Sequence, residues 1–222
     1  MRWNVPSCCE WQLYVIIDAA GIRGRALTDI ASAAIRGGAD VLQLRHKAAS
    51  AKELFAEADT LLPLASAGHV PLIINDQVDV ARAVCADGVH LGQTDLPVAE
   101  ARQKLGPSAL IGKSTHSLEQ ALAAEAEGAS YLGLGPIFPT PTKPDYGSIG
   151  PKSIRAVLER ITIPVVCIGG IDQRTLPHLL RRGARCVAVV RAVCAAEDPE
   201  RATRSLKEHL TQFSRSQSPR TL

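Results

Sequence analysis

The chain has few aromatic residues, only short apolar runs and little excess charge. Phe, Tyr and Trp make up 4% of its 222 residues, which argues against surfaces that stack nucleic acid bases. Its 25 basic side chains are scattered and are nearly balanced by 22 acidic ones, so nucleic acid is not an expected partner. The apolar runs, such as residues 13–17, fall far below the ~20 residues that cross a bilayer. With no secretory signal recognised either, we expect a cytoplasmic protein that does not contact a membrane.

The six cysteines form no pattern that is typical of a metal site or a disulfide framework. None belongs to a C-x-x-C pair, so buried free thiols are the expected state. Hydrophobic residues at 46% and charged residues at 21% are ordinary for a globular protein. We expect one catalytic domain over residues 1–213 and a disordered polar tail at 214–222.

Short β-branched runs alternate with longer stretches rich in Ala, Leu and Glu. The runs predict eight strands, at residues 12–17, 41–44, 71–74, 88–91, 109–111, 131–134, 164–168 and 186–190. Helical patterns occur at 28–36, 51–65, 78–84, 117–127, 152–159, 175–182 and 199–210.

This alternation predicts an α/β protein with a single (β/α)₈ TIM barrel, because eight βα units close that barrel. Nearly continuous apolar strands are typical of parallel strands buried on both faces. A doubly wound open sheet is the alternative, but residues 18–21 after the first strand lack a dinucleotide-binding loop.

Polar residues gather where the predicted strands end, which is where such barrels carry their chemistry. Gln43, Arg45 and Lys47 alternate, so on an extended backbone their side chains share one face. Two cations and an amide on that face suit a phosphate or pyrophosphate. Asp76 and Asp95 follow neighbouring strands at the same mouth and predict a Mg²⁺ site, because Mg²⁺ binds through one or two carboxylates together with substrate phosphates.

A second anion site is predicted at the last two strands. Gly169-Gly170 and Val190-Arg191 follow them, where backbone amides and a helix N-terminus commonly hold a phosphate. One barrel face would then hold a metal-assisted diphosphate and a metal-free monophosphate. This arrangement suggests the joining of two phosphorylated small molecules, with pyrophosphate as the leaving group.

Six segments in the right order resemble thiamine phosphate synthases, over about residues 13–192. The segments are QLRHK at 43–47, IND at 74–76, HLGQTD at 90–95, GKSTH at 112–116, GPIFPTPTK at 135–143 and IGGI at 168–171. The resemblance implies a (β/α)₈ transferase of thiamine biosynthesis that joins hydroxymethylpyrimidine diphosphate to hydroxyethylthiazole phosphate. In that family the diphosphate is thought to ionise first, which requires no strong general base.

The resemblance also implies roles for individual residues. Expected contacts on the pyrimidine diphosphate side are Gln43, Leu44, Arg45, His46, Lys47, Asn75, Ser114 and Lys143. Those on the thiazole phosphate side are Thr140, Pro141, Thr142, Gly170, Val190 and Arg191, the last three through backbone amides. Arg45, Lys47, Ser114 and Lys143 form the expected catalytic group, and Asp76 and Asp95 the magnesium site. The segment 135–150 is expected to close over the substrates.

The chain departs from the family pattern at Arg191, where a serine is usual. His46 should point away from the site, since it lies between two inward-facing residues. His90 is expected to be a packed, hydrogen-bonded histidine, and Trp3 and Trp11 to plug the bottom of the barrel or cap an edge.

Two other functions remain open at this point. The related thiazole tautomerase shares the barrel and would use His116 to move a proton. A non-enzymatic phosphate-binding protein would bind the thiazole phosphate without forming product. The two aspartates and the set of cations favour the synthase, because a tautomerase needs neither. The expected partners are small-molecule substrates, and a homo-oligomer is compatible with the sequence.

Overall fold

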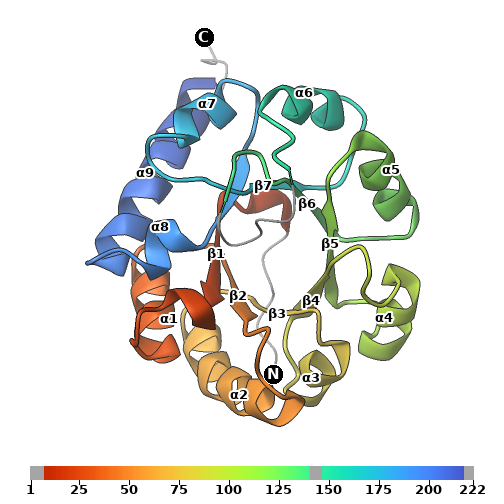
Figure 1. The fold of residues 1–222 in the computed structure, drawn as a ribbon, viewed down its shortest axis with the longest axis vertical. Coiled ribbons are helices and arrows are strands. Elements are labelled where there is room, and N and C mark those ends of the chain that lie inside the picture. Colours follow the sequence, from red (N-terminus) through yellow and green to blue (C-terminus); the bar gives the residue numbers. More distant parts are fainter. Residues whose placement is uncertain (1–7, 141–146, 218–222) are drawn as a thin grey trace.

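Eight parallel strands close into a barrel surrounded by helices (Figure 1). This computed structural model describes residues 8–140 and 147–217. Each strand pairs with the next along the chain, and the last pairs with the first. The predicted (β/α)₈ barrel is confirmed, and the alternative of an open doubly wound sheet is wrong.

The strands are short and the helices vary in length. The strands are β1 (Leu13–Asp18), β2 (Val41–Arg45), β3 (Leu72–Asn75), β4 (Gly88–Leu91), β5 (Leu110–Thr115), β6 (Tyr131–Leu134), β7 (Val165–Ile168) and β8 (Cys186–Val189). The α-helices are α1 (Leu27–Arg36), α2 (Ala51–Ala67), α3 (Val78–Ala83), α4 (Val98–Leu105), α5 (Leu118–Ala126), α6 (Lys152–Leu158), α7 (Leu176–Leu180), α8 (Arg191–Cys194) and α9 (Pro199–Gln217). Short 3₁₀ turns lie at Cys8–Glu10 and Ala19–Gly21.

The structure corrects the sequence prediction at four elements. Helices α4 and α8 were not predicted, and β5 continues to Thr115 rather than ending at residue 111. The polar residues 112–115 continue the strand because each of them pairs with a residue of β6. Helix α9 extends through Gln217, into the segment expected to be a disordered tail; residues 218–222 lie outside the described range.

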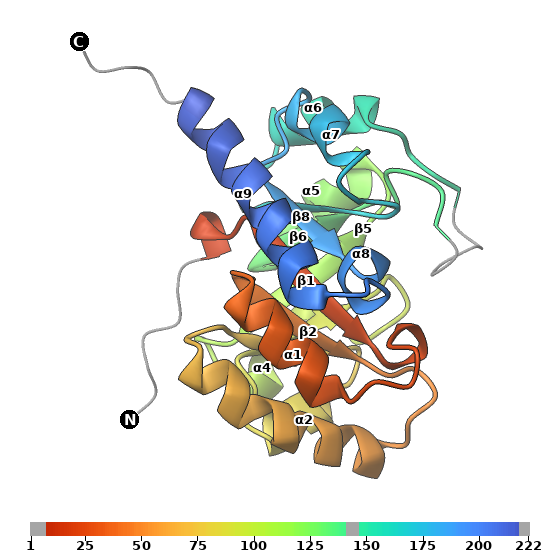
Figure 2. The same cartoon turned by 90° about the vertical axis from the view of Figure 1, so that its left-hand side faces the viewer.

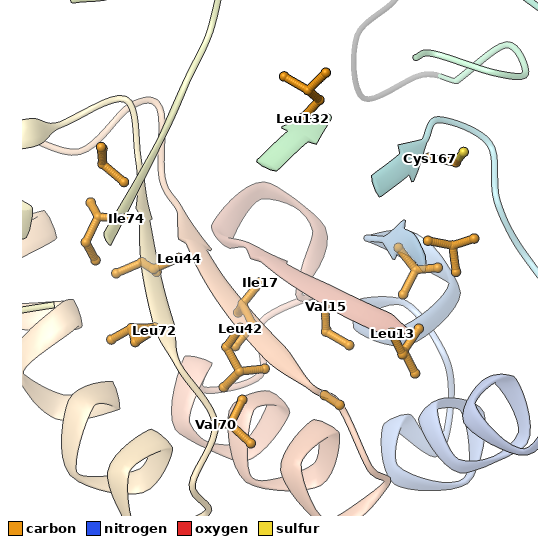
Figure 3. Packing of buried hydrophobic residues seen from close by; sticks show 14 of the residues in the cluster. Leu13, Val15, Ile17, Leu42, Leu44, Val70, Leu72, Ile74, Leu132 and Cys167 are labelled. Atoms are coloured by element: carbon orange, nitrogen blue, oxygen red, sulfur yellow. The ribbon is translucent and has the colours of Figure 1, made fainter. Parts of the chain in front are cut away.

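Alternate residues of each strand face the helices or the barrel interior. Leu13, Val15 and Ile17 of β1 belong to the outer hydrophobic layer together with residues of β2 and β3 (Figure 3). Tyr14 and Ile16 belong to the separate cluster inside the barrel. Because both faces of β1 are buried, its sequence is one apolar run, although only its even-numbered residues point toward the barrel interior.

The N-terminal end of the barrel is filled by an aromatic cluster. Trp11 is 3% exposed, and its ring lies 5.9 Å from that of Tyr14 and 5.2 Å from that of Tyr131, in edge-to-face arrangements. This agrees with the expectation for Trp11, whereas Trp3 lies outside the described residues.

Helix α9 crosses the side of the barrel and fastens the start of β1. It packs against α1, α8 and β1 (Figure 2). Lys207 of α9 pairs with Asp40 at 2.6 Å, and Asp40 accepts the backbone amides of Gln12 and Leu13 at 2.8 Å each. None of the helices within the described residues is both long enough and apolar enough to span a membrane.

Candidate active site

A cavity of about 550 Å³ opens at the C-terminal ends of the strands, where the polar residues were predicted to gather. Predicted site residues that line it are Gln43, Arg45, Asn75, Ser114, Thr140, Gly170, Val190 and Arg191. His116, the residue on which the tautomerase alternative depends, lines it as well. The prediction that site residues gather at the C-terminal ends of the strands therefore holds for residues from six of the eight strands and their following loops, which line one cavity.

One wall of the cavity carries a buried ion pair. Asp18 ends β1 and lies beside Arg45 in the parallel register of β1 and β2. The Arg45 guanidinium donates a hydrogen bond to the Asp18 carboxylate, and the side chains are 12% and 5% exposed. Asp18 also accepts the backbone amide of Ala20 at 3.2 Å. The sequence analysis did not assign Asp18 to the site, although Asp18 lies an even number of residues after Tyr14 in β1 and so faces the barrel interior as Tyr14 does.

Asp76 and Asp95 lie together beside the cavity. Burial, followed by the hydrogen bond and the charge from Asp95, raises the pKa of the Asp76 carboxyl. The Lys47 ammonium lies 3.5 Å from Asp76 and opposes that shift. Asp95 accepts the backbone amide of Gly92 at 2.6 Å, which holds its carboxylate in place.

This pair fits Mg²⁺. Two hard carboxylate ligands repel each other until a cation lies between them, and Mg²⁺ commonly takes one or two carboxylates plus phosphate oxygens and water. No cluster of three or more His, Cys, Asp or Glu ligands is found within residues 8–140 and 147–217. Phosphate oxygens of a substrate, together with water, would complete the coordination.

Two predicted contact residues point their side chains away from the cavity. Leu44 is fully buried in the outer hydrophobic layer between the barrel and the helices (Figure 3). The His46 ring lies 2.8 Å from Glu57 of α2, in agreement with the expectation that it faces away. Contact between either residue and a substrate is left to the backbone. Pro141, Thr142 and Lys143 lie outside the described residues.

Another wall is built by close backbone contacts after β7 and by the start of α8. Gly169 and Gly170 have φ values of +102° and +63°, which favour glycine. A Cβ at Gly170 would lie 2.7 Å from the Phe138 Cβ, so the chain at residues 136–139 approaches too closely for any side chain. Arg191 opens α8 with an exposed side chain, and Arg174 adds a second, unpredicted cation to the lining.

A hydrogen-bonded chain occupies the barrel interior beneath the cavity. The Gln43 amide donates to the Tyr14 hydroxyl at 2.7 Å, and the two hydroxyl groups of Tyr14 and Tyr131 lie 2.9 Å apart. The His90 Nδ1 lies 3.2 Å from the Tyr131 hydroxyl, and its Nε2 lies 2.9 Å from the Ser114 hydroxyl. His90 is thus hydrogen-bonded as expected, but it also lines the cavity. The two tyrosines were not predicted to belong to the site.

Comparison with known proteins gives the family. Residues 13–193 match the sequence profile of the thiamine monophosphate synthase family. The chain belongs to this family.

Individual relatives agree with that assignment. A thiamine-phosphate synthase of Chloroflexus aurantiacus is 50% identical over 205 residues, which cover 92% of this chain and 94% of the relative. The solved thiamine phosphate pyrophosphorylase from Pyrococcus furiosus has 37% identity and a TM-score of 0.85, and the match covers 95% of this chain and 99% of that chain. The chain is therefore an enzyme, a transferase of thiamine biosynthesis.

A more distant structure shares the fold alone. The (S)-3-O-geranylgeranylglyceryl phosphate synthase from Thermoplasma acidophilum is 15% identical, with a TM-score of 0.69 over 93% of this chain and 96% of that chain. The barrel by itself is thus compatible with other transfer reactions, and the function has to be argued from the site.

In this thiamine monophosphate synthase family member, His116 is held by the backbone. Its ring Nδ1 contacts the Gly135 carbonyl, and its backbone amide donates to the Gln120 side chain at 2.7 Å. Because a carbonyl oxygen can only accept, Nδ1 carries the hydrogen of this contact. A histidine held in this way beside the cavity is compatible with both a synthase and a tautomerase.

Proposed function

We propose that the enzyme couples hydroxymethylpyrimidine diphosphate to hydroxyethylthiazole phosphate, or its carboxylated tautomer, and releases thiamine phosphate and pyrophosphate, with carbon dioxide released in addition when the carboxylated tautomer is used. One observation supports the proposal: a single cavity is lined by two groups of residues that each suit an anion. Arg45 belongs to one group, with Lys47 and the aspartate pair nearby, while Gly170 and Arg191 belong to the other.

The reaction we propose is a dissociative substitution. The bond between the pyrimidine methylene carbon and the diphosphate oxygen breaks first, and its electron pair leaves with pyrophosphate. The thiazole nitrogen then donates its lone pair to the resulting carbocation. No proton has to be removed for the carbon–nitrogen bond to form, so the proposed reaction needs no strong general base.

The described cations would stabilise the leaving group. The guanidinium of Arg45, oriented by Asp18, and the ammonium of Lys47 would donate hydrogen bonds to the diphosphate as its negative charge grows. Lys143 is proposed to add a third cation. When bound between Asp76 and Asp95, Mg²⁺ would neutralise part of the same charge.

The remaining residues would orient the two substrates. We assign Gln43, Asn75 and Ser114 to the pyrimidine, since all three line the cavity on the diphosphate side. Thr140 would contact the thiazole, with Pro141 and Thr142, and the backbone at Gly170, Val190 and Arg191 would bind its phosphate.

A coupled assay tests the proposal. Purified enzyme is mixed with both substrates and Mg²⁺, and thiamine phosphate is detected by fluorescence after oxidation while released pyrophosphate is measured in parallel. We expect equal amounts of both products. Asp76→Ala should abolish pyrophosphate release, whereas Asp59→Ala, which removes an exposed carboxylate of α2, should not.

The same assay separates the alternatives. A tautomerase would change the thiazole precursor without needing the pyrimidine, and its activity would depend on His116. A phosphate-binding protein would bind the thiazole phosphate and form no product. Coupling that is undiminished in Asp76→Ala would contradict the proposed role of the aspartate pair.

A further inference from the structure

The hydrogen-bonded chain inside the barrel links two residues assigned to the pyrimidine. It runs from Gln43 through Tyr14, Tyr131 and His90 to Ser114, with four contacts of 2.7–3.2 Å. We propose that this chain is a positioning relay that fixes the hydrogen-bonding pattern shown to the ring, with a carbonyl acceptor at Gln43 and a hydroxyl donor at Ser114. The inference rests on the proposed function, since it concerns recognition of the same pyrimidine.

The direction of the relay follows from counting hydrogens. Gln43 Nε2 can only donate, so the Tyr14 oxygen accepts, and the single Tyr14 hydrogen goes to the Tyr131 oxygen. The Tyr131 hydrogen then goes to His90 Nδ1. A neutral His90 ring must carry its own hydrogen on Nε2, which donates to the Ser114 oxygen. The hydrogen of Ser114 is left for another acceptor.

Burial keeps the relay intact. Tyr14 and Tyr131 are 1% and 0% exposed, and this burial raises the pKa of both hydroxyl groups far enough that each keeps its hydrogen at any physiological pH. Reversing the relay would require the Gln43 amide, both hydroxyl groups and the His90 tautomer to change together. A partial reversal would leave two donors or two acceptors facing each other in a buried site, which is unfavourable.

The two ends of the relay are open to a ligand. Among side chains within the described residues, the one buried polar atom without a partner is Trp11 Nε1. The Gln43 carbonyl oxygen has no partner in the relay, so it must be reached from the cavity that Gln43 lines. Ser114 lines the same cavity. The cavity therefore offers an acceptor and a donor side by side.

This pattern matches one kind of ring edge. A ring nitrogen that accepts, next to an exocyclic amino group that donates, pairs with the Ser114 hydroxyl and the Gln43 carbonyl. The corresponding oxo ring presents an N–H donor beside a carbonyl acceptor. Its carbonyl would face the Gln43 carbonyl, acceptor against acceptor. Its N–H could reach only the remaining lone pair of the Ser114 oxygen, and the Ser114 hydrogen would then find no acceptor on the ring edge. We expect the amino pyrimidine diphosphate to bind about a hundredfold or more tightly than its oxo analogue.

The first experiment determines the direction of the relay from the His90 tautomer, in the absence of any substrate. In ¹⁵N-histidine-labelled protein at alkaline pH, where imidazoles are neutral, the His90 ring is assigned from the signals that disappear in His90→Asn. The expected tautomer has hydrogen on Nε2 and none on Nδ1. Hydrogen on Nδ1 would overturn the inference, because the relay would then run the other way and Gln43 would offer its amino group. This result does not depend on whether the enzyme couples the two substrates.

The second experiment interrupts the relay at Tyr131→Phe. We expect the Kd of the amino pyrimidine diphosphate to rise about tenfold and its preference over the oxo analogue to fall by at least about tenfold, while the Kd of thiazole phosphate stays unchanged. Tyr14→Phe interrupts the relay one step earlier and should act in the same direction if Tyr131→Phe does not fold. Thr203→Val is the control, since it removes another fully buried hydroxyl, which donates to the Pro199 carbonyl in α9.

The outcomes are distinguishable. An unchanged preference in a folded Tyr131→Phe or Tyr14→Phe variant would overturn the relay. Failure of the wild-type enzyme to bind either pyrimidine diphosphate would contradict the proposed function instead, and the His90 tautomer would still decide the direction of the relay.

Discussion

Replacing Asp18 by Asn removes one charge from the best-buried ion pair of the site while preserving the shape of the side chain. The carboxylate of Asp18 is 5% exposed and the guanidinium of Arg45 is 12% exposed, so water can do little to replace the lost partner. Removing one partner of a buried pair costs about 3–5 kcal/mol, and the partial exposure of Arg45 favours the lower end. In a protein of this size, about 3 kcal/mol corresponds to a fall of roughly 6–12 °C in Tm.

The measurement is thermal unfolding of Asp18→Asn with and without pyrophosphate and Mg²⁺. Because the ligand would supply negative charge next to Arg45, it should raise the Tm of the variant more than that of the wild type. The KM for the diphosphate substrate should also rise, since Arg45 loses its orienting partner. Glu159→Gln is the control: its pair with Arg155 is 60% and 77% exposed, so the Tm should not change. A variant that melts like the wild type and gains no more from pyrophosphate would refute the reasoning.

Two further predictions concern stability. Gly88→Ala should destabilise the barrel by about 3 kcal/mol or more in thermal unfolding, because its Cβ would lie 1.9 Å from the Leu110 carbonyl oxygen. Gly147→Ala is the control and should be neutral, because a Cβ there has no neighbour within 4 Å among the described residues. Asp76→Asn should raise the Tm at neutral pH. Burial and Asp95 raise the pKa of the Asp76 carboxyl in the folded state. The stability that the protein has with Asp76 protonated is therefore lost as the pH rises through that pKa. The gain should disappear as acidification protonates the wild-type carboxyl, and a gain independent of pH would contradict this origin.

The barrel could be predicted because its strands are buried on both faces and therefore appear as apolar runs. The same signal failed at β5, where the run ends at residue 111 but the backbone pairing with β6 continues to Thr115. Helix α4 was missed for a related reason. Its eight residues contain three charged side chains and bury only Val98 and Ala101, so the apolar face is too narrow to recognise.

The site was predictable where a polar residue lies near the C-terminal end of an apolar strand, as at Gln43, Arg45 and Asn75. It was not predictable where an aromatic side chain lies nearer the start of the strand. Tyr14 and Tyr131 resemble core residues in the sequence, and only the closure of the barrel places their hydroxyl groups next to each other.

The alternation of side chains along a strand distinguishes the residues of the six segments that face the cavity from those that face the helices. Leu44 and His46 belong to the segment shared with the family, yet they alternate with inward-facing residues and their side chains turn outward. Asp18 belongs to none of the six segments, but it has the inward parity of Tyr14 and Ile16 and lies beside Arg45. Applying the alternation rule to every strand, rather than to β2 alone, would have found it.

The two proposed parts of substrate recognition lie largely in different parts of the fold. Apart from Arg45, which ends β2, the groups that would bind phosphate, such as Gly170 and Arg191, lie on segments that follow strands. The relay proposed to recognise the pyrimidine ring is built on the strands themselves. Loops tolerate substitution more easily than the strands of a closed barrel. Changes at the loops should therefore alter how tightly each phosphate is held, while changes within the barrel should alter which ring is accepted, at a greater cost in stability because the relay is buried.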